Sequence, residues 1–190
     1  MRDFISRARF LLVLTLLMPG VRPLLAAEAH PEYQLKSAFI YNFATFVDWP
    51  NDIGKQLTLC VAAPPEAMQY FTQLDGKPVG RLTLKLRNLG QADSAEGCRI
   101  LFVADSQSAS FDDWLSEVGD EEVLTIAESE DWLKKGVVMS LVMQGNRVTF
   151  DVNLEAARGE NIGISSRLLR LARKVYGLEA QDEPADKKPK

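Results

Sequence analysis

The stretch CRILFVADSQSASFDDWLSEVGDEEVLTIA, residues 98–127, decides the fold class. Its apolar run at 98–104 predicts a buried strand, Ser110 begins a predicted helix that ends near Val118, and the run at 123–127 predicts a second strand. Strands that alternate with helices are typical of a largely parallel sheet with helices packed on its faces. The stretch therefore predicts an α/β fold.

The flanking sequence continues this alternation in both directions. On the N-terminal side we expect a helix at Glu32–Val47, a strand at 57–63, a helix at about 65–74 and a strand at 82–87. On the C-terminal side we expect a helix at 129–135, strands at 137–143 and 147–152, a helical turn at Asn153, and a helix from Ser165 or Ser166 to about Tyr176. Together they predict a three-layer sandwich: a mostly parallel sheet with helices on both faces and a C-terminal antiparallel hairpin.

The first 29 residues have the composition of a secretory signal peptide. Basic residues lie at positions 2, 7 and 9, an apolar run follows at 10–18, and small residues lie between Ala26 and Ala29. The run is too short to span a bilayer, which takes about 20 apolar residues. We expect cleavage between about Ala26 and Ala29; an uncleaved membrane anchor is the alternative. The mature chain is then one domain over 30–178, followed at 179–190 by a polar tail that we expect to be disordered.

The charge balance argues against nucleic acid as a partner. The chain has 22 basic and 26 acidic residues, and removal of residues 1–29 leaves 18 and 24. Nucleic-acid binding depends on the neutralisation of phosphates by cations, so an acidic exported chain is a poor candidate.

Histidine is almost missing from the chain, and this narrows the chemistry. The one histidine, His30, lies at the expected cleavage site. The folded region therefore cannot form a Ser-His-Asp triad, a Cys-His pair or a His-ligated zinc site. We predict no catalytic residue, no metal site and no cofactor, although chemistry that uses carboxylates alone stays open.

The two cysteines are expected to form a disulfide. Cys60 and Cys98 are an even pair in an exported chain, and disulfides persist in oxidising compartments. The alternative is two separate buried thiols.

Five segments in order resemble the YfiR-like family of periplasmic proteins. They cover nearly the whole mature chain and lie at 36–50, 76–81, 98–103, 146–158 and 164–173. In this family Cys60 and Cys98 match the positions of one disulfide. Some members have a second disulfide near the last hairpin, where this chain has no cysteine.

The resemblance implies a periplasmic repressor. Such a protein binds the periplasmic sensory domain of an inner-membrane diguanylate cyclase and lowers cyclic di-GMP and biofilm formation. An OmpA-like outer-membrane lipoprotein can sequester the repressor, and homodimers are expected from the resemblance alone. Two alternatives stay open: a module that senses a small ligand for another membrane receptor, and an envelope enzyme that uses carboxylates alone.

The C-terminal region supplies the candidate partner-binding residues. Two isoleucines flank Gly163 just before a predicted helix cap, and they are hard to bury together. With Leu154 they predict an exposed apolar patch with a polar rim. The alternative is that one isoleucine packs back onto the helix as a hydrophobic staple. The predicted surface consists of Asp151, Leu154, Arg158, Ile162, Ile164 and Arg167.

The predicted final helix has two faces. Leu168, Leu171, Ala172 and Val175 have the spacing of a core face. The cations Arg167, Arg170 and Lys174 fall on another face. There they are either simply solvated near a helix C-terminus, or meet an acidic partner or anionic lipid.

Overall fold

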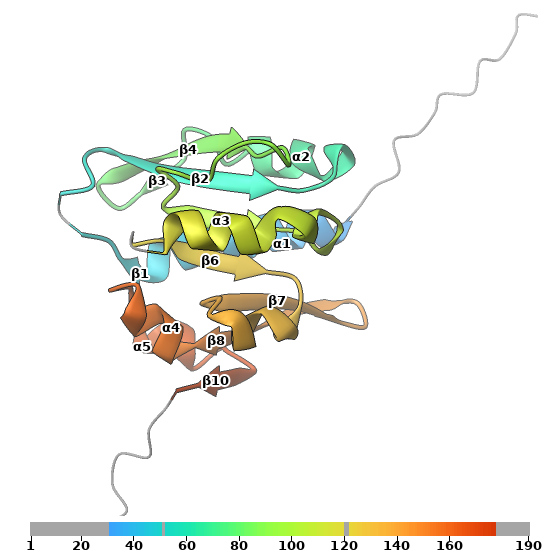
Figure 1. Cartoon of the computed structure of the whole chain (residues 1–190). Coiled ribbons are helices and arrows are strands. Elements are labelled where there is room, and N and C mark those ends of the chain that lie inside the picture. Colours follow the sequence, from blue (N-terminus) through green and yellow to red (C-terminus); the bar gives the residue numbers. More distant parts are fainter. Residues whose placement is uncertain (1–30, 51, 120–121, 178–190) are drawn as a thin grey trace, which may run out of the picture.

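The computed structural model describes residues 31–50, 52–119 and 122–177 (Figure 1). The expected signal peptide at 1–29 and tail at 179–190 lie outside these residues. The helices are α1 Pro31–Phe46, α2 Pro65–Thr72, η1 Asp105–Ser110, α3 Phe111–Val118, η2 Glu130–Lys135, α4 Leu154–Gly159 and α5 Ser166–Leu169. The strands are β1 Val47–Asp48, β2 Gln56–Ala62, β3 Pro78–Val79, β4 Leu82–Asn88, β5 Ile100–Val103, β6 Leu124–Ala127, β7 Met139–Gln144, β8 Arg147–Asn153, β9 Gly163–Ile164 and β10 Lys174–Tyr176.

One eight-stranded sheet organises the described part of the chain. Its strand order is β10-β8-β7-β6-β5-β2-β4-β3, and β1 and β9 form a separate two-stranded sheet. The neighbours from β4 through β2, β5 and β6 to β7 pair in parallel, whereas β7 and β8 form the antiparallel hairpin. The predicted mostly parallel sheet with a C-terminal hairpin is confirmed.

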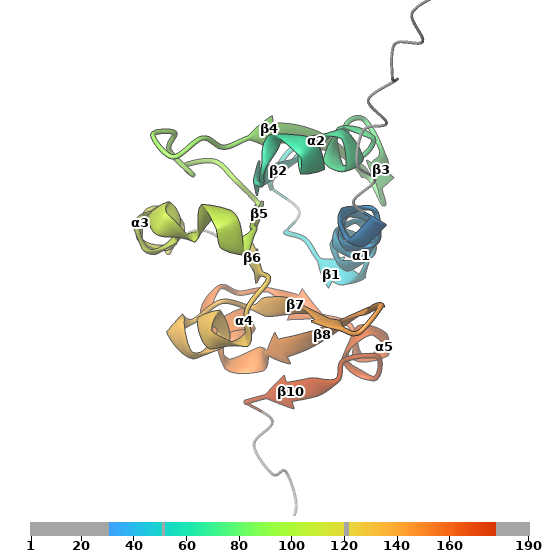
Figure 2. The same ribbon diagram turned by 90° about the vertical axis from the view of Figure 1, so that its right-hand side faces the viewer.

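Helices cover both faces of this sheet. Figure 2 shows α1 and α3 on opposite sides of the strands. On β2, Leu57, Leu59 and Val61 pack with α1 and α2, whereas Cys60 and Ala62 pack with α3. Because successive strand residues point to opposite faces and both faces are covered, the central strands β5 and β6 are buried at every residue and are largely apolar. The predicted three-layer sandwich is confirmed.

The predicted final helix is wrong beyond its first turn. Ser165 caps α5 by accepting a hydrogen bond from the Leu168 backbone N–H at 3.3 Å, as expected of a helix start. The helix ends at Leu169, and β10 then pairs in parallel with β8, with Val175 opposite Val152. Val175 therefore packs against the core from a strand, and Leu171 is left 66% exposed.

Candidate partner-binding surface

The predicted apolar patch is not present as an exposed surface. Leu154 is 9% exposed and Ile162 is 6% exposed, and both belong to the larger hydrophobic core cluster. Ile164 is half-buried because β9 pairs with β1, which places it opposite Val47. The prediction that these residues form an exposed patch is therefore wrong. The β1–β9 pairing holds Gly163 and Ile164 against β1, which directly follows α1.

Asp151 is also wrongly assigned to a polar rim. Its side chain is fully buried, and its carboxylate accepts hydrogen bonds from both Nε and Nη2 of Arg173, the former at 2.8 Å. The same guanidinium contacts Glu130 of η2. These two carboxylates raise the pKa of Arg173. Arg173 therefore joins β8, β10 and η2, and Asp151 is a structural residue.

Glu130 lies on the outer side of this network. Its other carboxylate oxygen is 3.4 Å from Nζ of Lys174. The hydrogen bond from Arg173, followed by that from Lys174, lowers the pKa of the Glu130 carboxyl group. The ionised Glu130 carboxylate therefore stabilises the fold, and protonation of this group removes that stabilisation.

This network predicts a component of acid sensitivity. Because the folded-state pKa of Glu130 is lowered, its contribution is complete above the unfolded value of about 4.3 and is lost as pH falls through the folded value. Glu130→Gln should therefore destabilise the protein at neutral pH and make its thermal midpoint fall less between pH 5 and 2.5. The measurement is thermal unfolding by circular dichroism across that range, with Asp113→Asn, an exposed carboxylate on α3, as the control. Parallel curves for Glu130→Gln and wild type would contradict the assignment.

The two remaining predicted rim residues are exposed. Arg158 on α4 donates a hydrogen bond to the Gly177 carbonyl at 3.0 Å. Arg167 on α5 is exposed, as is Arg170, which follows the helix. Sequence reasoning placed Leu171 in the core; the structure places it beside these arginines in the turn after α5, where the Leu171 N–H bonds the Leu168 carbonyl.

The disulfide between Cys60 and Cys98 is formed, and both residues are fully buried. Sequence reasoning did not identify its neighbour, Arg87 of β4. Arg87 Nη2 is 2.9 Å from Cys98 Sγ and 2.8 Å from the Glu96 carbonyl, and its Nε is 3.3 Å from Cys60 Sγ. The disulfide and this guanidinium together hold the β4–β5 connection against the sheet.

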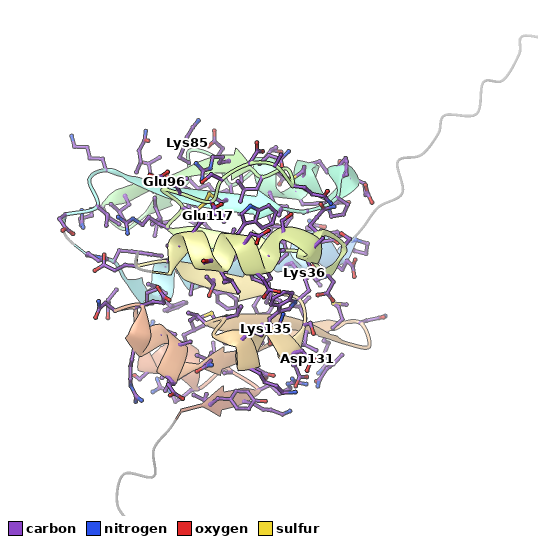
Figure 3. All side chains as sticks on the ribbon, viewed as in Figure 1. Lys36, Lys85, Glu96, Glu117, Asp131 and Lys135 are labelled. Carbon is purple, nitrogen blue, oxygen red and sulfur yellow. A yellow bond between two sulfur atoms is a disulfide. The ribbon has the colours of Figure 1, made fainter. Side chains whose placement is uncertain are left out.

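A buried ion pair at the other end of the strands was also missed. Lys36 of α1 is 4% exposed, and its Nζ is 2.8 Å from Glu128, which directly follows β6. Lys36 Nζ also lies 4.7 Å from the centre of the Tyr33 ring. Burial, followed by the charge of Glu128, raises the pKa of the Tyr33 hydroxyl. Figure 3 places Lys36 at the end toward which the β2 and β6 arrows of Figure 1 point.

This end of the sheet is where α/β proteins commonly bind ligands. The chain passes from β2 to β4 on one side and from β5 to β6 on the other, and crevices form outside the carboxyl ends of strands at such a reversal. At this end the second Glu128 oxygen accepts a hydrogen bond from the Asp105 N–H at 3.0 Å, which ties the segment after β6 to the segment after β5. The ion pair therefore fixes α1 to the sheet.

An open hollow of about 460 Å³ lies between the β4–β5 connection and α3. Asp93, Asp113 and Glu117 line it. One Glu117 oxygen accepts hydrogen bonds from the Ser94 hydroxyl and the Ala95 N–H. In residues 31–50, 52–119 and 122–177 no group of three or more His, Cys, Asp or Glu side chains is arranged to hold a metal ion.

Comparison with known proteins identifies the family. The model of the YfiR/HmsC-like family matches residues 33–173, which is most of the chain. This chain belongs to the YfiR/HmsC-like family. The family is periplasmic and regulatory, and its function is not catalysis. Within the described part of this member, none of the helices has the length and apolar character needed to cross a bilayer.

Two solved structures share the fold of this YfiR/HmsC-like chain. One is a conserved domain protein from Vibrio cholerae, with 13% identity and a TM-score of 0.55. The other is an ABC domain from Streptococcus pneumonia in complex with L-Trp, with 12% identity and a TM-score of 0.50. Each match covers 75% of this chain and 60% of the other chain. At these identities the similarity establishes the α/β fold alone.

Proposed function

We propose that this chain is an exported periplasmic repressor that binds the periplasmic sensory domain of an inner-membrane diguanylate cyclase. It thereby lowers cyclic di-GMP and biofilm formation. The observation that carries the proposal is the YfiR/HmsC-like match over residues 33–173. The sequence supports it with an N-terminal export signal at 1–29.

A periplasmic location limits how such a protein can act. Cyclic di-GMP is made and used in the cytoplasm, so a periplasmic protein cannot touch it. The protein can only shift a conformational equilibrium in a partner that spans the membrane. A ligand shifts such an equilibrium through its different affinities for the two states, with about 1.4 kcal/mol for each tenfold change.

Two further partners are part of the proposal. An OmpA-like outer-membrane lipoprotein would sequester the repressor and release the cyclase, and a second copy of the chain would form a homodimer. Both follow from family resemblance. Of the residues predicted to bind a partner, Arg158 and Arg167 are exposed and therefore remain candidates.

The test of this function is the cellular concentration of cyclic di-GMP. Deletion of the gene should raise cyclic di-GMP and adhesion, because the cyclase loses its repressor. The increase should disappear when the cyclase is also deleted. Removal of residues 2–29, which should retain the protein in the cytoplasm, should reproduce the deletion. Unchanged cyclic di-GMP after deletion, with both proteins expressed, would contradict the repressor function and favour a ligand-sensing module for another receptor.

A further inference from the structure

The most exposed large apolar side chain in the described part of the chain lies in the turn between α5 and β10. Leu171 is 66% exposed, compared with 43% for Leu35, 41% for Tyr176 and 36% for Met143. Single exposed leucines are common and need no explanation by themselves. What distinguishes Leu171 is the charge around it.

The segment that holds Leu171 is strongly basic within an acidic chain. Residues 161–177 contain four cations and no Asp or Glu, whereas the whole chain has a net charge of −4. Two of the four are paired, because Arg173 contacts Asp151 and Glu130, and Lys174 contacts Glu130. Arg167 and Arg170 are exposed and form no ion pair with any residue of the described segments. Two full positive charges therefore face solvent beside the leucine.

The local backbone fixes these three side chains on one surface. Arg167, Arg170 and Leu171 have the i, i+3, i+4 spacing of neighbours on a helical turn. The Arg170 N–H bonds the Ser166 carbonyl and the Leu171 N–H bonds the Leu168 carbonyl, so the turn continues past α5. We name Arg167, Arg170 and Leu171 the Leu171 surface.

Both ends of the Leu171 surface are anchored. Before it, Ser165 caps α5 and Leu168 is 2% exposed in the core. After it, the Arg173 backbone N–H donates a hydrogen bond to the Phe150 carbonyl at 2.8 Å, and the Arg173 side chain donates hydrogen bonds to the Asp151 carboxylate. A surface held in place before binding loses less conformational entropy on association.

We propose that the Leu171 surface is the docking site for an acidic surface of the cyclase's periplasmic domain, which receives Leu171 in an apolar pocket between carboxylates. This inference rests on the proposed function. An apolar anchor with arginines around it is typical of protein interfaces, where arginine is enriched. Anionic lipid is the weaker fit, because lipid recognition uses clusters of four to eight cations and this surface has two that are unpaired.

Binding of the purified mature protein to the purified periplasmic domain of the cyclase tests the proposal. Leu171→Glu and the double variant Arg167→Glu/Arg170→Glu should each raise the Kd at least tenfold. The double variant should also weaken the salt dependence of binding. Leu35→Glu on α1 and Arg147→Glu at the hairpin tip are the matched controls. They should stay within twofold of wild type, and all variants should keep the wild-type thermal midpoint within a few degrees.

The possible outcomes distinguish an error in the proposed docking surface from an error in the proposed repressor function. If wild type binds and both Leu171-surface variants bind equally well, the surface is wrong and the repressor function stands. If wild type does not bind the domain, this proposal fails together with the proposed function. If wild type instead binds vesicles of phosphatidylglycerol but not phosphatidylcholine, and the double variant loses that binding, the surface binds lipid and the protein partner is overturned.

Discussion

Replacement of Arg173 by alanine is expected to lower the free energy of unfolding by about 3–5 kcal/mol, the usual cost of removing one partner of a buried ion pair. The carboxylate of Asp151 is fully buried, and Arg173 supplies both of its side-chain hydrogen bonds. Without the guanidinium the charge stays in the core with neither water nor a counter-ion. Because domains of this size are stable by only about 5–15 kcal/mol, the loss should be obvious in urea unfolding.

Two further variants test whether the loss of stability comes from the unpaired buried charge of Asp151. Arg173→Met combined with Asp151→Leu removes both charges and should be clearly more stable than Arg173→Ala, because an apolar pair leaves no uncompensated charge. Arg170→Ala, an exposed arginine three residues earlier, should change the unfolding free energy by less than about 0.5 kcal/mol. Equal losses for Arg173→Ala and Arg170→Ala would refute the buried network.

Replacement of Cys60 by serine is expected to cost about 4 kcal/mol in the chain-entropy model. The bridge joins residues 38 apart in sequence, so its loss enlarges the unfolded ensemble. Urea unfolding of Cys60→Ser and of the double serine variant should give similar free energies, both well below wild type. Thiol labelling of unfolded, unreduced wild type should find almost no free cysteine. Two labelled thiols per chain, or a Cys60→Ser variant as stable as wild type, would contradict this account.

The sheet was predictable because a strand that is buried on both faces consists largely of apolar residues, which can be recognised in the local sequence. Residues 98–104 and 57–63 are apolar except for Arg99 and Thr58, and these segments contain β5 and most of β2. Helices between them can be recognised from periodicity and caps. The Cys60–Cys98 bridge could also be expected, because the chain has two cysteines and its first 29 residues predict export.

The C-terminal region was less predictable because distant contacts decide it. The helical spacing of Leu168, Leu171 and Val175 predicted one long helix. The pairing of Arg173 with Asp151, 22 residues away, and of β10 with β8 converts its second half into a strand. These contacts bury Asp151, which was predicted to lie on an exposed rim. They leave Leu171, which was predicted to lie in the core, exposed.

The burial of other residues left no signal in the neighbouring sequence. Lys36 Nζ lies 3.9 Å from Glu32 of the same helix, but its closer partner is Glu128, at 2.8 Å and 92 residues further along the chain. Lys36 occupies one position in a helical pattern, and nothing near it in sequence indicates a buried cation. Burial of Ile162 likewise depends on the pairing of β9 with β1, two-residue strands too short to recognise from sequence.

Under the proposed function, the mature protein represses a membrane diguanylate cyclase from the periplasmic side. The most direct measurement is cyclic di-GMP synthesis by the purified full-length cyclase in lipid nanodiscs, titrated with purified residues 30–190. We expect a saturable fall in the rate of synthesis, because a preference of about 1.4 kcal/mol for the inactive state lowers the ratio of active to inactive cyclase tenfold. A cyclase reduced to its soluble cytoplasmic domain should be unaffected. An unchanged rate for the full-length cyclase at saturating protein, or equal inhibition of the isolated cytoplasmic domain, would contradict the account.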